Sequence, residues 1–207
     1  MTAIRAFFWD VGGVLLTNAW DHNERTAALS HFQLDADDFQ RRHETVVEPF
    51  ERGELTLDEY LAQTVFYHLR PFTRDEFRDY MFSLSKPLPG SLDFAQALGR
   101  SGKYLMATIN NESRELNLHR IEKFGMRDIF RLFFSSCFVR MRKPDPEIYQ
   151  LALDVTQISP AESVFVDDRP ENLKAAAGVG MQTVQMRGLE QLQADLAKLG
   201  VQPWQGL

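Results

Sequence analysis

The chain has 207 residues, a net charge of −6 and a single cysteine, Cys137. This length supports one large domain, or one domain with a smaller insertion, and a hydrophobic content of 44% is enough to bury a real core. The acidic balance, without any run of Lys or Arg, argues against a nucleic-acid partner, and no apolar run is long enough to span a membrane. One cysteine allows no internal disulfide and the N-terminus lacks a signal-peptide pattern, so we expect a soluble, cytoplasmic protein. The sequence leaves the oligomeric state open.

The first structural signal is an apolar run at residues 4–9 that ends in Asp10. A run this short and apolar is typical of a strand buried inside a parallel sheet. Gly12 and Gly13 follow, and glycines allow the backbone to turn sharply and to approach a ligand closely. Open α/β sheets bind ligands at the carboxyl ends of their strands, which makes Asp10 a candidate site residue. Taken alone, this aspartate could equally well begin a loop.

The next segment, up to about residue 85, has no strand-like run and shows helical spacing. We expect four helices there, at about residues 23–32, 36–47, 57–68 and 74–84. A Thr-x-x-Glu capping box begins each of the last two, and a stiff segment with two prolines then returns the chain. The prediction is an inserted four-helix domain, 17–86, within a core domain made of residues 1–16 and 87–207.

After residue 90 the chain alternates regularly between helical and strand-like patterns. We expect strands at residues 104–109, 132–135, 163–166 and 182–185, and helices at 92–98, 113–124, from 145 onward, 171–177 and 189–199. A capping box at Ser159 predicts one more helical turn. Such alternation builds βαβ units with right-handed crossovers, so the expected fold class is α/β, with a three-layer Rossmann-like parallel sheet.

Polar residues stand where the carboxyl ends of these strands should meet. They are Asp10, the pair Asn110 and Asn111, Lys143, the pair Asp167 and Asp168, and Asn172. Each has an ordinary explanation, as turn residues, a surface lysine or a helix-capping pair. Two adjacent acids at the end of a buried strand are nevertheless costly unless a cation or a proton offsets their charge. Oxygen ligands with a few waters suit Mg²⁺.

The order of these features resembles the haloacid dehalogenase (HAD) superfamily over nearly the whole chain. Asp10 matches the nucleophile of the first motif, Lys143 the third motif, and residues 164–172 the metal-binding fourth motif. The inserted helices match the family's helical cap between the first and second motifs. The third and fourth motifs look especially like those of the bacterial sugar-phosphate phosphatases, including the glucose-1-phosphate phosphatases.

This resemblance implies a Mg²⁺-dependent phosphatase that acts on a small phosphorylated metabolite. Asp10 would attack phosphorus and form an aspartyl-phosphate, which water then hydrolyses. Mg²⁺ would be held by Asp10, by the backbone carbonyl of Gly12 and by Asp168. Asp167 and Asn172 would orient ligands or waters around the metal.

The resemblance also implies a set of groups around the phosphate. This set comprises Lys143, the backbone N–H groups of Gly12 and Gly13, Asn111, and either Asn110 or Thr108. The second motif usually supplies a Ser or Thr hydroxyl, and alignment places Asn110 there. Thr108 is the alternative, two residues earlier on the same strand face, and either side chain can donate to phosphate.

The family's first motif usually carries a second aspartate two residues after the nucleophile, where this chain has Gly12. Two alternative functions therefore stay open. One is a dehalogenase, which uses the same nucleophile on carbon and needs no metal, although Asp167 and Asp168 would repel its carboxylate substrate. The other is a non-catalytic protein that binds a phosphorylated ligand.

The cap residues would select the substrate. Trp20, Asp21, His22 and His43 are candidates from their position alone. Each is more often a packed or solvated helix residue than a ligand contact.

Overall fold

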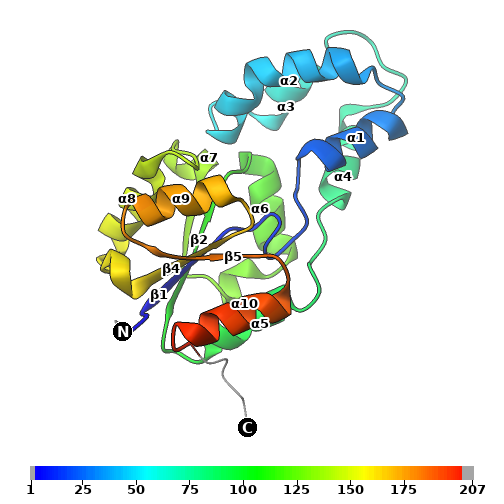
Figure 1. Cartoon of the computed structure of the whole chain (residues 1–207). Helices are drawn as coiled ribbons and strands as arrows, with labels where there is room; N and C mark the ends of the chain where they lie inside the picture. The colour runs from blue at the N-terminus through cyan, green and yellow to red at the C-terminus, as the bar shows by residue number, and fades with distance from the viewer. Residues whose placement is uncertain (1–2, 202–207) are drawn as a thin grey trace.

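A computed structural model describes residues 3–201. Five parallel strands form one sheet in the order β3-β2-β1-β4-β5. The strands are β1 Ala6–Trp9, β2 Leu105–Asn110, β3 Leu132–Ser135, β4 Ser163–Asp167 and β5 Gln182–Gln185. The helices around them are α5 Ser91–Arg100, α6 Arg114–Lys123, α7 Ser136–Val139, α8 Pro146–Thr156, α9 Pro170–Gly178 and α10 Leu189–Lys198. Helices lie on both faces of the sheet (Figure 1), which confirms the predicted three-layer Rossmann-like α/β fold.

Strand β1 lies at the centre of the sheet, and all four of its residues are fully buried. Its last residue, Trp9, pairs in register with Thr108 of β2 and Val166 of β4. The N–H of Asp10 then donates to the Val166 carbonyl at 2.8 Å. Asp10 therefore leaves the sheet at the carboxyl end of its central strand, as the apolar run predicts.

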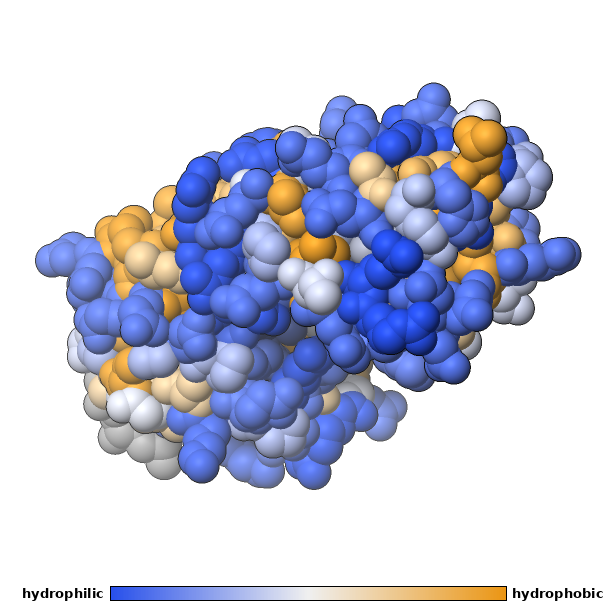
Figure 2. Space-filling model, turned by 90° about the horizontal axis from the view of Figure 1, so that it is seen from above, coloured by the Kyte–Doolittle hydropathy of each residue, from blue (hydrophilic) through white to orange (hydrophobic). Residues whose placement is uncertain are grey.

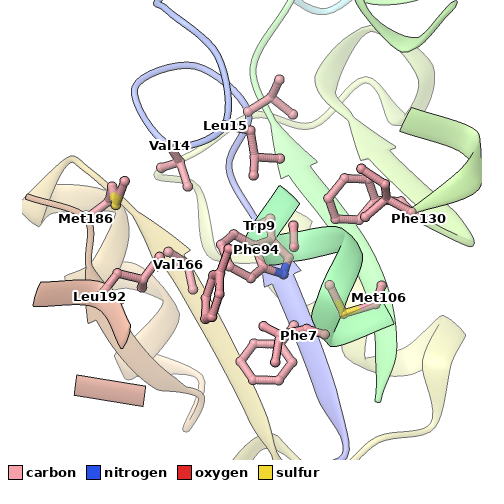
Figure 3. Close-up of a cluster of buried hydrophobic side chains, with 14 of the residues drawn as sticks. Phe7, Trp9, Val14, Leu15, Phe94, Met106, Phe130, Val166, Met186 and Leu192 are labelled. Carbon is pink, nitrogen blue, oxygen red and sulfur yellow. The ribbon is translucent and has the colours of Figure 1, made fainter. Parts of the chain in front are cut away.

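The side chains of β1 enter two separate cores because successive residues of a strand point to opposite faces. Phe7 and Trp9 pack against Phe94 of α5 and join Leu192 of α10 in one cluster (Figure 3). Phe8 enters the other cluster, on the side of α8 and α9. Both faces of β1 are thus covered, which explains why its sequence is apolar throughout and does not alternate.

Four helices are inserted between β1 and α5: α1 His22–His31, α2 Ala36–Glu51, α3 Leu57–Thr64 and α4 Arg74–Ser83. They pack around a hydrophobic cluster of their own and stand to one side of the sheet (Figure 1), forming the expected helical cap. Hydrogen bonds between Thr17 and Lys86 link the two segments through which the chain enters and leaves the cap. The Thr17 N–H donates to the Lys86 carbonyl at 2.8 Å, and the Lys86 N–H donates to the Thr17 hydroxyl at 3.0 Å.

Both capping boxes of the cap are confirmed, at Thr56 and at Thr73. Other local predictions were wrong. The helix that starts at Leu57 ends at Thr64, well before residue 68, and the preceding helix runs past residue 47 to Glu51. Ser159 makes no side-chain cap on the 3-10 turn that follows it, and the short helix α7 was not expected. Three of these four errors lie at the ends of elements, where assignments vary most, and the fourth is a helix of a single turn.

The surface seen from above is mostly hydrophilic, with apolar residues in small separate groups (Figure 2). Within the described residues, no helix has both the length and the apolar character needed to cross a membrane.

Tyr60 stands at the centre of the cap and is fully buried. Its hydroxyl accepts a hydrogen bond from Trp20 Nε1 at 2.8 Å and lies 2.7 Å from His43 Nδ1. Its ring stacks on Phe50 of α2, with the ring centroids 4.0 Å apart. The hydroxyl can donate one hydrogen bond and accept two, so the tautomer of His43 decides which of the two groups donates in this contact.

We expect Tyr60→Phe to lower the free energy of unfolding by about 1–3 kcal/mol, because it leaves the buried Trp20 N–H and His43 Nδ1 without their partner. Tyr80→Phe is the matched control in the same cap, since no hydrogen bond of the Tyr80 hydroxyl is found among the described residues. Urea denaturation measures both variants. Equal stability of the two would show that the buried hydroxyl contributes nothing.

Candidate active site

Asp10 lies in a cavity of about 220 Å³ between the carboxyl end of the sheet and helices α1 and α2. The cavity is lined by residues of both parts of the molecule: Asp10, Gly12, Asn18, Ala19, Trp20, Asp21, Arg25, His43, Val47, Phe50, Glu51, Asn111, Glu112, Ser113, Arg120, Arg142, Lys143, Pro144, Arg169, Glu171 and Asn172. Most of these side chains are polar or charged. The site is therefore suited to a small polar ligand.

The ammonium group of Lys143 contacts two of the other predicted site residues. Its Nζ lies 2.8 Å from Asp10 Oδ1 and donates to Asp167 Oδ2 at 2.6 Å. Burial opposes the charge on this lysine, but the two carboxylates outweigh burial and raise its pKa. Lys143 is therefore a fixed ammonium, and one of its three N–H donors remains for another acceptor.

Asp167 is saturated with hydrogen bonds. Its Oδ1 accepts from the Arg169 N–H at 2.8 Å, and Asn172 Nδ2 donates to both carboxylate oxygens, at 3.1 and 3.0 Å. Its Oδ2 also accepts from Lys143. These contacts orient Lys143 and leave Asp167 little capacity to bind anything else directly.

Asp168 differs from Asp167 in its hydrogen bonding. Its Oδ1 is buried and has no hydrogen-bond partner in the part of the chain that the structure describes. Burial, and then the charge of Asp167, raise the pKa of its carboxyl. Carboxylate oxygens of Asp10, Asp167 and Asp168 lie within 4.8 Å of one another. An unpaired buried oxygen beside two further carboxylates is the donor set that a hard divalent cation prefers.

The carboxylate of Asp10 is contacted by a backbone N–H and by an ammonium group. Its Oδ1 accepts from the Val11 N–H at 2.7 Å, as well as facing Lys143. Burial raises its pKa to about 7, against the opposing effect of Lys143. A cation bound between Asp10 and Asp168 would lower that pKa and keep the carboxylate ionised.

The two glycines after Asp10 have different roles. The Gly13 N–H donates to the Leu16 carbonyl at 2.8 Å, and its role toward a phosphate stays a prediction. Gly13 has φ +72°, and a Cβ there would lie 2.6 Å from Asp168 Cγ. Gly12 lines the cavity, has no left-handed φ, and faces Asn18, whose Oδ1 lies 3.0 Å from the position of a Gly12 Cβ. Asn18 thus occupies the space beside the residue that replaces the family's second aspartate.

The predicted phosphate-binding side chains separate into two groups. Asn111 lines the cavity, and its amide exchanges two 2.8 Å hydrogen bonds with the backbone of Lys143. Asn110 and Thr108 are buried behind the lining. Asn110 donates to Asn117 at 3.0 Å and accepts from Ser135 at 2.8 Å. The choice between Asn110 and Thr108 for the second motif stays a prediction.

Three of the four candidate residues of the cap line the cavity, and one does not. Trp20, Asp21 and His43 line the cavity. His22 is exposed and lies outside the lining, because it begins α1 on the side facing solvent. His43 is held neutral, since burial first and Arg25 second lower its pKa to about 4. His22 is therefore not placed, and His43 is not charged, to protonate a leaving group at neutral pH.

Several lining residues carried no signal in the sequence. Asn18, Arg25 and Glu51 belong to a segment that reads as ordinary helix and loop. Glu112 and Arg120 form a buried ion pair of 3.1 Å at the sheet side of the cavity, and burial raises the pKa of Glu112 to about 7. Charged residues on amphipathic helices are usually solvated, so only tertiary contacts single these out.

Comparison with known proteins agrees with this geometry. A family model described as haloacid dehalogenase-like hydrolase matches residues 4–180, and the chain belongs to that family. It is 29% identical over 160 residues to the chloroplast flavin mononucleotide hydrolase 1 of Arabidopsis thaliana, covering 77% of this chain and 64% of that protein. It is also 29% identical over 122 residues to (S)-2-haloacid dehalogenase 4A of Burkholderia cepacia, covering 58% of this chain and 52% of that one. The chain thus spans less than two thirds of the length of these curated relatives.

Solved structures show the same fold. A HAD family enzyme from Bacteroides thetaiotaomicron superposes with a TM-score of 0.79 at 21% identity, covering 97% of this chain and 100% of that chain. A second structure of that enzyme, in complex with magnesium and inorganic phosphate, gives a TM-score of 0.73 at 22% identity, covering 89% and 95% of the two chains.

We expect Gly13→Ala to be more destabilising than Gly102→Ala. Both glycines have a left-handed φ, of +72° and +66°, so both variants incur roughly the same backbone strain of about 1 kcal/mol. Only at Gly13 must the new methyl group also displace the Asp168 carboxylate, since nothing lies within 4 Å of a Cβ at Gly102. Urea denaturation compares them, and equal losses would mean that Asp168 moves aside without cost.

Proposed function

We propose that this chain is a Mg²⁺-dependent phosphatase that transfers the phosphoryl group of a small phosphorylated metabolite first to Asp10 and then to water. The observation that carries this proposal is the position of Asp10. It lies between a fixed ammonium, Lys143, and Asp168, whose buried oxygen has no partner among the described residues. The magnesium and phosphate bound by the Bacteroides enzyme of the same fold, and the phosphorylated compound in the name of the Arabidopsis relative, support it.

The residues present fit a magnesium ion. Asp10 and Asp168 would hold it together with the Gly12 carbonyl. Asp167 and Asn172 would orient the groups around it, since Asp167 binds Lys143 and Asn172 binds Asp167. When bound, the metal would offset the negative charge of the acids and of the phosphate. Gly13 provides the room that Asp168 needs beside the loop.

The protein groups then have distinct tasks. Asp10 forms a bond to phosphorus while the ester P–O bond breaks and the alcohol oxygen leaves with the bonding electrons. Lys143 donates its remaining N–H to a phosphate oxygen and stabilises the charge that develops there. A water molecule subsequently attacks the aspartyl-phosphate, which releases inorganic phosphate and restores Asp10.

The alternative functions explain the site less well. A dehalogenase would use Asp10 on carbon without a metal, which gives no role to the buried Asp168 oxygen. A binding protein would not need a nucleophile paired with a fixed ammonium. Both remain outcomes of the experiment below.

We expect Asp10→Asn to lower Mg²⁺-dependent hydrolysis of p-nitrophenyl phosphate by roughly 10³-fold or more, because the amide cannot act as the nucleophile. Chelation with EDTA should abolish the wild-type rate, and added Mg²⁺ should restore it. Asp93→Asn, on the exposed side of α5, is the control. A fully active Asp10→Asn variant would exclude this mechanism, and halide release from 2-chloropropionate without phosphatase activity would favour the dehalogenase.

The absence of an acid at Gly12 predicts a dependence on the leaving group. General acid catalysis typically contributes roughly 10²–10⁴-fold, and neither His22 nor His43 can supply it here. Aryl and acyl phosphates, and sugars phosphorylated at the anomeric carbon, should therefore react much faster than simple alkyl phosphates. Pre-steady-state rates for a series of esters at saturating Mg²⁺ measure this dependence.

A matched pair of variants tests the cause. Gly12→Asp combined with Asn18→Ala adds the carboxylate and removes the side chain that crowds its Cβ, while Asn18→Ala alone is the control. The double variant should flatten the dependence on leaving-group acidity. Comparable alkyl and aryl rates in the wild type would show that another acid is present.

A further inference from the structure

Five cationic side chains line the cavity among the described residues, and four of them have a carboxylate partner. Those four pairs are Lys143 with Asp10 at 2.8 Å, Arg120 with Glu112 at 3.1 Å, Arg142 with Glu51 at 2.6 Å, and Arg169 with Asp21. The fifth cation, Arg25 of α1, has no carboxylate within 4.0 Å in residues 3–201. A partly buried guanidinium without a counter-ion is an expensive arrangement unless a ligand supplies one.

Arg25 is held in a fixed position. Its Nη1 donates to the Trp20 carbonyl at 2.6 Å. Part of the conformational entropy that this side chain would lose on binding a ligand is therefore already lost in the folded protein. Its charge acts on the cap side of the cavity. Burial lowers the pKa of His43 and Arg25 lowers it further, whereas burial raises the pKa of Glu51 against the opposing effect of Arg142, Arg169 and Arg25. His43 is neutral there, and Glu51 already pairs with Arg142.

Among the described residues, Arg25 is therefore the one cation of the lining without a carboxylate partner. Arg142 and Arg169, in loops at the carboxyl end of the sheet, pair with Glu51 and Asp21. The remaining acid of the lining, Glu171, is exposed in the first turn of α9. The catalytic carboxylates lie instead at the sheet end, where the proposed metal and phosphate would offset them.

We propose that Arg25 binds a carboxylate on the leaving group of the substrate, so that the substrates are small phosphorylated carboxylic acids. This proposal rests on the proposed phosphatase function, which places the phosphate at Asp10 and the leaving group toward the cap. A guanidinium binds a carboxylate with paired, charge-assisted hydrogen bonds, which a neutral hydroxyl cannot reproduce.

The size of the cavity agrees with this class of substrate. A cavity of about 150 Å³ holds one benzene molecule, so about 220 Å³ has room for a phosphate and an acid of a few carbon atoms. A neutral sugar phosphate would leave Arg25 without a counter-ion, and it is the competing outcome of the test.

The test compares two esters that differ only at the far end, phosphoglycolate and 2-hydroxyethyl phosphate. Binding is measured by calorimetry with Mg²⁺ on the full chain carrying Asp10→Asn, which prevents turnover. We expect phosphoglycolate to bind about 10-fold or more tightly than 2-hydroxyethyl phosphate. Adding Arg25→Gln should weaken phosphoglycolate binding by about 10- to 100-fold and change 2-hydroxyethyl phosphate binding by less than about 3-fold.

Two further variants complete the design. Arg25→Lys keeps the charge but not the paired donors, so it should recover only part of the preference. Arg41→Gln, on the exposed face of α2 where Arg41 pairs with Asp38, should change neither affinity. Because 2-hydroxyethyl phosphate binding reports on folding, a misfolded variant would lose both ligands and be recognised.

Equal affinity of the two esters, equal weakening of both by Arg25→Gln, or no binding of either ester overturns the proposal. Turnover by the chain with Asp10 intact separates this inference from the proposed function. Hydrolysis of phosphate esters without a preference for the carboxylate would leave the phosphatase and remove the role of Arg25. Arg25-dependent binding of phosphoglycolate without any hydrolysis would do the reverse.

Discussion

The site depends on one buried ammonium group. Lys143 Nζ lies within hydrogen-bonding distance of both Asp10 and Asp167, at 2.8 and 2.6 Å, and brings together the carboxyl ends of β1 and β4. Two carboxylates this close would repel each other strongly in a buried place, and an unpaired lysine would lose its proton there. Each charge is therefore stable only because the others are present. Asn111 fixes the lysine from behind by bonding to its backbone, and Asn172 fixes Asp167.

Helices α1 and α2 of the cap form the second side of the site. Ion pairs from Asp21 to Arg169 and from Glu51 to Arg142 link α1 and α2 to the loops around the site, and the Ser136 hydroxyl donates to the Glu51 carbonyl at 2.6 Å. These contacts surround Asp10 with polar groups and limit the space for a leaving group. The carboxyl end of the sheet thus supplies Asp10 and Lys143, whereas α1 and α2 supply the opposite wall of the cavity.

Much of the fold could be predicted because its signals are local. The apolar run before Asp10, the capping boxes at Thr56 and Thr73 and the alternation after residue 90 are properties of neighbouring residues. Features that depend on distant contacts could not be predicted in this way. The N–H of Gly13 donates within the loop, and the missing side chain makes room for Asp168, which is 155 positions away.

The sequence by itself determined the α/β class, the inserted helices and the set of Asp10, Lys143 and Asp168, because strand ends and their polar residues can be recognised along the chain. Only the tertiary structure decided how Arg25, His43 and Glu51 are used. A charged helix residue has the same local sequence whether it faces solvent or a cavity. Its role is set by which partners it meets, and here Glu51 meets Arg142, His43 meets Tyr60, and Arg25 meets no acid among the described residues. The physical reason is that pairing of buried charges is a long-range property of the fold, which local spacing does not encode.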